Sequence, residues 1–458
     1  MQLKLNLKDM EIYEKKQALT ELGSYRPAFM MMRLSFPFPS SEQGVNELSD
    51  SNLSVFIHEY VHFLQDISSY CLLNNAYYYS EYLHTAVNHI YTIPGRYFEI
   101  PLRMPRNKGN VDANEFINKT CFGSNEEIDT LIITKIKSHS EPFPYQGVGL
   151  KCIDNRILCT AKHGEIHFGY LAVMESMAYI LESKISRPQS SPCDFPYMSA
   201  QLVTEHVYPE FGGDVLNILA LCDVSLQFSN PGNVFFGMLE QMRDRAWLPN
   251  KPEDVYDYVY SQNACVMGRD MPPYKALTEM SMTVERCVQS YVKDMAISAS
   301  YQDFVHNLLR YGLCLRLAEP YFMLDLARGG YARKNRQLIR IMGYTGMPII
   351  EDSLHTFHTI LPNGWTSSDA LLEVFPAIEQ IHKCLHDGAD ICEMIGFCED
   401  SEKLYEEGRL DDPAPIVNDN CLESPWKRCF DKRLCPYALL WKHWNLSRWQ
   451  PIRRKKRT

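Results

Sequence analysis

Apolar residues recur along most of this chain with the spacing of α-helices. The clearest example is residues 51–71, which contain neither Pro nor Gly. Ser49 or Asp50, just before this stretch, can cap the N-terminus of the helix that it predicts. The aromatic-rich residues 74–93 predict a second helix, which ends at Pro94.

Strands are expected in fewer places. Residues 28–38 are short, apolar and closed by prolines, which predicts a strand at or near the edge of a sheet. Residues 156–160 and 165–168 flank a four-residue turn and predict a hairpin. A helix over residues 170–186 follows and is ended by Pro188.

Beyond residue 195 nearly every apolar stretch has helical spacing. The predicted helices span residues 212–229, 233–245, 273–297, 300–328, 333–342 and 367–386. Residues 406–420 have the composition of a linker. We therefore predict an α+β fold that is mainly helical, with regions at residues 1–250 and 251–415 and a small Cys- and Trp-rich segment at residues 416–458.

Charge and composition narrow the function. The net charge is −10, yet residues 424–458 carry eleven Lys or Arg and one acidic residue, so the rest of the chain is acidic and does not resemble a general nucleic-acid binder. No apolar run is long enough to predict a membrane span. The charged start is unlike a secretory signal, so we expect a cytoplasmic protein whose 15 cysteines are reduced.

Within residues 51–71 stands the sequence His58-Glu59-Tyr60-Val61-His62. Two histidines four apart lie on the same face of a helix and can bind one metal ion. Glu59 can then act as general base toward a water molecule. This pattern is the His-Glu-x-x-His motif of zinc peptidases. A polar stripe on an amphipathic helix is the alternative interpretation.

A third zinc ligand is needed, and Glu175 is the best candidate, because it is a carboxylate on an otherwise apolar helix with small neighbours. Glu182, seven residues on and on the same face, is the second candidate for the ligand, and it is otherwise expected to orient a ligand from behind. Asp66, one turn after His62, is expected to orient that histidine by a hydrogen bond, and as a direct ligand it is the less favoured option. The Gly-x-x-His extension of the metzincins is absent.

With these residues the chain resembles the gluzincin-type zinc metallopeptidases, over roughly residues 25–185. The resemblance implies a zincin-like core, made of a small sheet, the His-Glu-x-x-His helix and the helix that bears Glu175. It departs from the thermolysin-like pattern Asn-Glu-x-x-x-Asp, because Met174 precedes the Glu and Tyr179 stands four residues after it. Residues 28–38 resemble the edge strand that holds an extended substrate in such enzymes.

The residue that polarises the scissile carbonyl is not fixed by spacing. The candidates from the sequence are Tyr179 and His167, with Tyr170 and His206 as further options. The absence of a signal peptide and Gln65 three residues after His62 are similar to intracellular bacterial zincins associated with phage defence or stress regulation.

A second metal site is predicted near the C-terminus. Cys421, Cys429 and Cys435, with His443, supply enough ligands for a closed structural zinc site, and an iron–sulfur cluster would use similar ligands. Cys392 or Cys398 could take the place of His443, and free cysteines are the alternative interpretation. The tryptophans of this segment, interleaved with Lys and Arg, either bind single-stranded nucleic acid or pack the segment onto the acidic body.

Together these features predict a zinc peptidase that cleaves a protein or peptide inside the cell, with residues 251–415 selecting the substrate or responding to a regulatory partner. The alternative is a zincin-like binding or regulatory protein without turnover, which contacts nucleic acid through its C-terminal tail.

Overall fold

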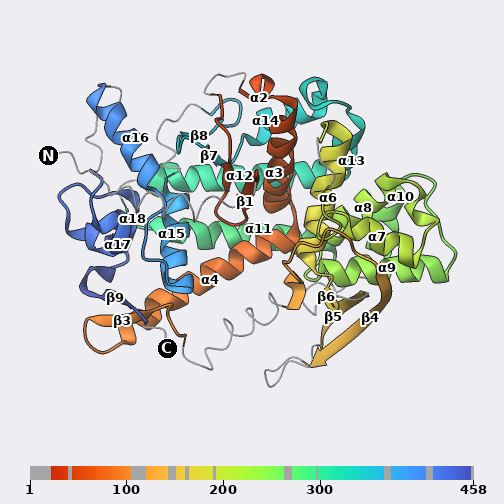
Figure 1. Cartoon of the computed structure of the whole chain (residues 1–458), viewed down its shortest axis with the longest axis horizontal. Coiled ribbons are helices and arrows are strands. Elements are labelled where there is room, and N and C mark those ends of the chain that lie inside the picture. Colours follow the sequence, from red (N-terminus) through yellow and green to blue (C-terminus); the bar gives the residue numbers. More distant parts are fainter. Residues whose placement is uncertain are drawn as a thin grey trace.

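A computed structural model describes residues 22–39, 44–104, 120–142, 151–159, 164–188, 192–262, 271–295, 298–365, 373–408 and 416–454. Within them the chain has an α+β fold that is mainly helical, as the sequence pattern predicts (Figure 1). None of the helices in these ranges combines the length and the apolarity that crossing a membrane requires.

The helices follow one another along the chain with few strands between them. The α-helices are Gly44–Glu47 (α2), Asp50–Ser68 (α3), Tyr70–Thr92 (α4), Tyr170–Ile185 (α6), Ser199–Val207 (α7), Val215–Ser225 (α8), Pro231–Asp244 (α9), Glu253–Ser261 (α10), Pro273–Gln289 (α11), Ser298–Ala318 (α12), Phe322–Arg328 (α13), Arg336–Thr345 (α14), Val374–Asp387 (α15), Ile395–Glu406 (α16), Asn420–Glu423 (α17) and Pro436–His443 (α18). Short 3₁₀ helices span Phe211–Gly213 (η1), Ser290–Val292 (η2), Ala332–Lys334 (η3), Pro425–Phe430 (η4) and Leu446–Arg448 (η5).

The strands form small sheets. Their bounds are Gly23–Arg26 (β1), Met31–Leu34 (β2), Tyr97–Ile100 (β3), Ile133–Pro142 (β4), Lys151–Cys159 (β5), Glu165–His167 (β6), Ile349–Glu351 (β7), Phe357–His358 (β8) and Gln450–Arg453 (β9). In the described part of the chain the sheet orders are β1-β2-β7-β8, β3-β9 and β4-β5-β6. The predicted hairpin is present as β5 and β6, which pair antiparallel.

The strand predicted over residues 28–38 is shorter than expected. Ala28 and Met30 have positive φ angles of 70° and 53°, so the chain turns there, and only β2 is extended. β2 pairs with β1 on one side and with β7 on the other, so β1 forms the edge of this sheet. The sequence therefore located the sheet correctly, but it did not reveal β1.

The predicted helices are present with small changes among the described residues, outside which residues 296–297 and 367–372 of two of them lie. Residues 300–328 form two helices, α12 and α13, because Pro320 cannot donate the backbone hydrogen bond that a continuous helix needs. The sequence pattern did not predict α2, α7, α10, α16, α17 or α18. The N-cap before α3 is Ser49, whose hydroxyl accepts a hydrogen bond from the Asn52 N–H at 3.2 Å.

α3 is the central element of the core. It is buried along most of its length and packs against α4, α6, α12 and β1. Gly312 of α12 allows a close approach, because a Cβ there would lie 2.1 Å from the Ile67 carbonyl oxygen. A helix buried on nearly all sides has little freedom to shift, so its polar side chains are held in fixed positions.

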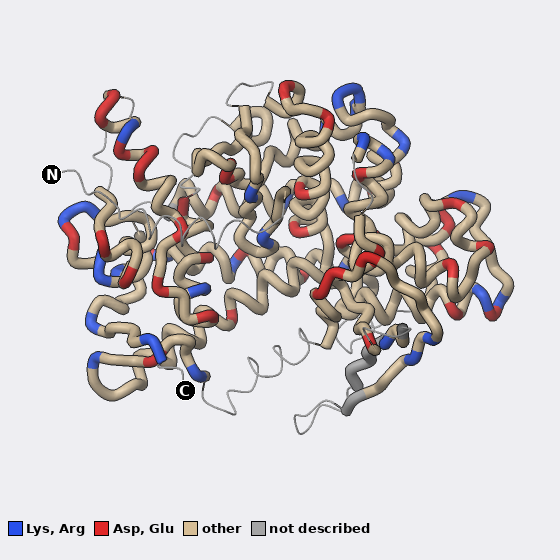
Figure 2. Tube along the Cα trace, in the orientation of Figure 1, with Lys and Arg blue, Asp and Glu red and all other residues tan. Residues whose placement is uncertain are grey.

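The C-terminal segment is packed onto the rest of the molecule. β9 pairs in parallel with β3, and Arg453 and Arg454 form ion pairs with Asp390 and Glu99. Trp426, Trp441 and Trp449 are buried. Of the two alternatives that the sequence left open, this burial agrees with packing of the segment onto the rest of the molecule. Basic residues of the C-terminal segment are interleaved with acidic ones (Figure 2).

The region boundaries at residues 250 and 415 stay predictions. The β2–β7 pairing joins segments on opposite sides of residue 250, and the β3–β9 pairing joins segments on opposite sides of both boundaries.

Candidate metal centre

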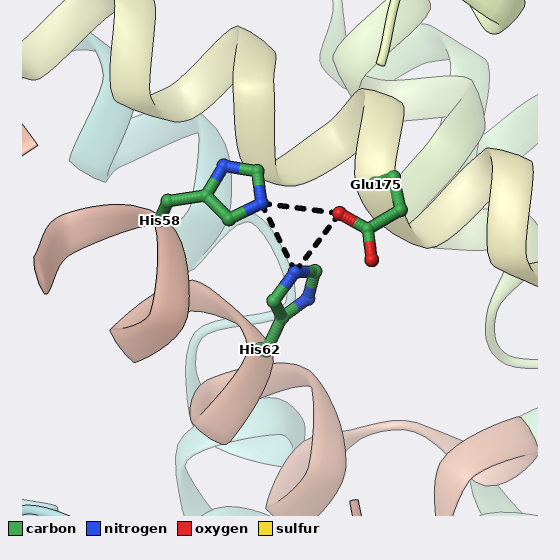
Figure 3. A group of neighbouring side chains, drawn as sticks. All are labelled: His58, His62 and Glu175. Carbon is green, nitrogen blue, oxygen red and sulfur yellow. Dashed lines mark hydrogen bonds and ion pairs between the residues drawn. The ribbon is translucent and has the colours of Figure 1, made fainter. Parts of the chain in front are cut away.

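The candidate site lies where α3 packs against α6. His58 and His62 occupy adjacent turns of α3, and Glu175 projects from α6 toward them (Figure 3). Gly169 precedes α6, and a Cβ at this position would lie 2.3 Å from the Phe122 carbonyl oxygen. Glycine therefore lets the start of α6 pack closely, which fixes where Glu175 emerges.

Three ligand atoms meet at one point. The Nε2 atoms of His58 and His62 are 3.2 Å apart, and Glu175 Oε2 is 3.1 Å from the first and 3.2 Å from the second. All three side chains are largely buried, and the side chain of Glu175 keeps 16% of its surface exposed. This buried His/His/Glu group could hold a metal ion, as the sequence spacing predicts.

Hydrogen bonds behind the histidines fix which ring nitrogen faces the group. Glu182 Oε2 lies 3.1 Å from His58 Nδ1, and its Oε1 accepts from the Ser54 hydroxyl at 2.6 Å. A carboxylate can only accept from the ring, so Nδ1 of His58 carries a proton and Nε2 can present a lone pair. Glu182 therefore orients His58, one of the two roles that the sequence left open for it.

Gln65 plays the same part for His62. Its Nε2 donates to the Met174 carbonyl oxygen at 3.1 Å, so its Oε1 faces His62 Nδ1, at 2.8 Å. The amide oxygen accepts a hydrogen bond from the Nδ1–H of His62, so the Nε2 atom of this ring carries a lone pair. Sequence reasoning missed this role, although a glutamine three residues after a histidine on a helix could have indicated it.

Asp66 does not have the position predicted for it. Its carboxylate accepts from the Tyr25 hydroxyl at 2.8 Å and from the Ala28 N–H at 3.0 Å, while Gln65 occupies the Nδ1 side of His62. Burial raises the pKa of Asp66 to about 7, although these hydrogen bonds and His62 lower it. Asp66 therefore ties α3 to the turn between β1 and β2.

The acidic side chains around His58 and His62 favour positive charge at this group. Burial lowers the pKa of His58, but the hydrogen bonds with Glu175 and Glu182 outweigh it and raise this pKa well above its usual value. Burial also lowers the pKa of His62, but the charge and hydrogen bond of Glu175 outweigh it and raise this pKa above its usual value. The two histidines hold the pKa of Glu175 below its usual range, despite burial. A metal ion would supply the same compensation as the protons do.

Glu59 lies beside this group on α3 and is 6% exposed. Its charge is felt by both histidines, since it is among the causes that raise their pKa values. β1 passes directly over it, because a Cβ at Gly23 would lie 3.1 Å from Glu59 Oε1. The candidate general base is thus between the histidines and the edge strand of the sheet.

The candidates for carbonyl polarisation lie elsewhere. His167 is on β6 with its side chain 40% exposed and its Nε2 3.8 Å from Glu165. Tyr179 is near Glu182, whose charge together with burial raises the pKa of its hydroxyl. Tyr170 packs against Phe122, and His206 is on the surface at the end of α7. None of these four side chains contributes to the ligand group in the described residues.

Tyr197 is a neighbour of the site that sequence reasoning missed. Its ring packs edge-on against His58, with centroids 5.6 Å apart, and it is partly exposed. Burial, followed by Glu175, raises the pKa of its hydroxyl, which therefore stays protonated and able to donate. No local motif marks Tyr197, because it reaches the site from the segment between α6 and α7.

The second predicted site is not assembled as expected. Cys429 lies beside Ser447, and His443 lies half-buried at the end of α18. Among the described residues, His58, His62 and Glu175 are the only group with three ligand atoms within 4.8 Å of one another. Cys421, Cys429, Cys435 and His443 therefore do not form so close a group.

Comparisons of the chain with protein-family models, with curated proteins and with solved structures found no match.

Proposed function

We propose that the chain is a zinc-dependent peptidase of the gluzincin type, which hydrolyses amide bonds of a protein or peptide. The observation that carries the proposal is the meeting of His58 Nε2, His62 Nε2 and Glu175 Oε2 beside Glu59. A polar stripe on a surface helix, the alternative interpretation, does not account for α3, which is buried around these residues.

The donor set suits zinc. Two imidazole nitrogens and one carboxylate oxygen are a common protein ligand set of catalytic zinc, which keeps a further coordination position open. The Nδ1–H groups of His58 and His62 donate hydrogen bonds to Glu182 and Gln65, which orient both rings, as at known zinc sites. Zinc held there would supply Lewis acidity, which would acidify water and polarise a carbonyl group.

Glu59 is the residue to which we assign proton transfer. As general base it removes a proton from the water that attacks the scissile carbonyl carbon. The C–O bond forms, the C–N bond breaks, and the proton passes from Glu59 to the leaving nitrogen. Gly23 and Val55 pack against one side of the Glu59 carboxylate and exclude water there. A Cβ at Gly23 would lie 2.6 Å from Val55 and 3.1 Å from Glu59 Oε1.

The edge strand β1 supports a peptide as the substrate. Among the described strands β1 pairs with β2 alone, so its other edge offers backbone groups to an extended chain. A peptide bound there would pass near Glu59. Tyr197, protonated and partly exposed beside His58, is placed to donate a hydrogen bond to the carbonyl oxygen as it gains charge.

Glu59→Gln tests this proposal. The variant keeps the shape of the side chain and removes the base, so we expect metal content to be unchanged and turnover to fall by at least about 100-fold. Turnover is measured by mass spectrometry of products from a proteome-derived peptide library. Glu240→Gln, a matched change at an exposed position of α9, should leave turnover unchanged.

Equal turnover in wild type and Glu59→Gln would overturn the assignment of the base. A wild-type protein that binds zinc but cleaves no member of the library would favour the non-catalytic binding protein instead.

A further inference from the structure

Four cysteines outside the helix-borne site lie together in the C-terminal lobe. Cys392 precedes α16, Cys398 lies in α16, Cys421 lies in α17 and Cys435 is the N-cap of α18. They are between 4% and 6% exposed. The Cys392 N–H donates to the Cys421 carbonyl oxygen at 2.8 Å, which joins the two chain segments that carry them.

The thiols of this cysteine quartet are near enough to interact with one another. Cys392 interacts electrostatically with Cys398, Cys435 and Cys421. Cys398 interacts in the same way with Cys435 and Cys421. The four thiols are therefore neighbours, although they come from segments far apart in the sequence.

The sulfur atoms are surrounded by hydrogen-bond donors. The backbone N–H groups of Met394 and Ala438 lie beside the sulfurs of Cys392 and Cys435, respectively. Arg428 Nη1 donates to Cys421 Sγ at 2.6 Å. A guanidinium has no acceptor, so this sulfur must accept, the role that a thiolate fills best.

Arg428 is held in place as part of this environment. It is 2% exposed, and its other nitrogens donate to Asp431 Oδ2 at 2.6 Å and to the Ile416 carbonyl oxygen at 2.7 Å. A buried cation fixed beside buried sulfurs is an arrangement that favours negative charge on them. One guanidinium cannot offset four thiolates, so a metal is needed if all four are ionised.

We propose that Cys392, Cys398, Cys421 and Cys435 bind one metal centre through four thiolates, either a zinc ion or an iron–sulfur cluster. Four cysteine thiolates are a complete ligand set for both. No three of the sulfurs lie within 4.8 Å of one another in the described structure. A single zinc ion, with Zn–S distances of about 2.3 Å, would draw them together. A cluster of several metal atoms would fit a wider spacing.

The centre would be structural. Two of its ligands precede residues 409–415 in the sequence and two follow them. The centre would therefore tie α17 and α18 to α16 and to the segment between α15 and α16. It does not depend on the peptidase proposal, because no residue is shared between the two sites.

Metal analysis of the full-length protein, purified without oxygen, tests the proposal. We expect His62→Ala to lose the metal of the helix-borne site and to keep the metal of the quartet. Cys398→Ser should lose the quartet metal alone, and Cys429→Ser should lose neither, which makes it a matched control within the same lobe. Zinc without visible absorption identifies the mononuclear centre, whereas iron, acid-labile sulfide and a brown colour identify the cluster.

Two results would overturn the proposal: His62→Ala protein that contains no metal, or Cys398→Ser protein with the full metal content of wild type. If Cys398→Ser does not fold, X-ray absorption of the His62→Ala protein decides. A shell of sulfur atoms alone around the metal supports the quartet, and a shell with nitrogen or oxygen ligands refutes it.

Discussion

His58, His62 and Glu175 come from the middle of two long helices, whereas the cysteine quartet comes from a loop, a helix end and two short helices. The first group is held by helix packing and by hydrogen bonds that its histidines donate to Glu182 and Gln65. The second joins segments that have little regular structure between them. We infer that metal at the first group serves chemistry, and that metal at the second serves stability.

The largest expected effect that tests this difference is a change in the local stability around each group. Cys398→Ser should make backbone amides of α17 and α18 exchange with solvent at least about 100-fold faster, because structural metal binding contributes folding free energy. His62→Ala should change the exchange of α3 and α6 by much less, since packing holds those helices. Hydrogen–deuterium exchange with mass spectrometry measures both, with Cys429→Ser as control. Equal protection in all variants would contradict the inference.

A second prediction separates Gln65 from Asp66 at the helix-borne site. Gln65→Leu removes the acceptor for His62 Nδ1, so zinc affinity should fall by about 10–100-fold. Asp66→Asn should leave zinc affinity nearly unchanged, because Asp66 bonds Tyr25 and Ala28 instead. Competition with a chromogenic chelator measures both affinities. A greater loss in Asp66→Asn would restore the role that the sequence alone assigned to Asp66.

A third prediction is a pH dependence of stability. The pKa of Asp66 is raised by burial to about 7 in the folded state, against an ordinary value of 3.8. Because the folded state holds the proton more tightly, Asp66 contributes stability that is complete below about pH 4 and is lost as the pH rises through 7. The loss is at most about 1.4 kcal/mol per pH unit within this window.

Denaturant unfolding at pH 5 and pH 7 measures this contribution. Asn cannot ionise, so the free energy of unfolding of Asp66→Asn should fall less between the two pH values than that of wild type. Identical slopes for the two proteins would show that Asp66 is not the titrating group.

Much of the helix-borne site could be predicted from the sequence because its geometry is local. Residues four apart on a helix share a face whatever surrounds the helix, so His58 and His62 were identified together. Glu175 was identified because a lone carboxylate on an apolar helix needs a partner. The sequence assigned the orienting role to Asp66 and missed Gln65, since both follow His62 by about one turn. The Met174 carbonyl on one side and the β1–β2 turn on the other decided it.

The C-terminal cysteines show where such reasoning ends. Spacing grouped Cys429 with Cys421 and Cys435, because all three lie in one short stretch of sequence. In the fold Cys429 lies beside Ser447, whereas Cys392 and Cys398, which precede residues 409–415, lie near Cys421 and Cys435. Irregular segments impose no fixed direction on successive side chains, so sequence distance there says little about spatial distance.

The sequence by itself determined that this chain is mainly helical, that α3 is buried and that it carries a pair of imidazoles with a carboxylate between them. Helical periodicity and the cost of burying charge are enough for that. Only the tertiary structure decided how the distant groups meet this pair: Glu175 joins it, Glu182 orients His58, and Tyr197 and the edge strand β1 lie beside it. Their positions depend on how α3 packs against α6 and the sheet, which is set by shape complementarity between segments and by no local pattern.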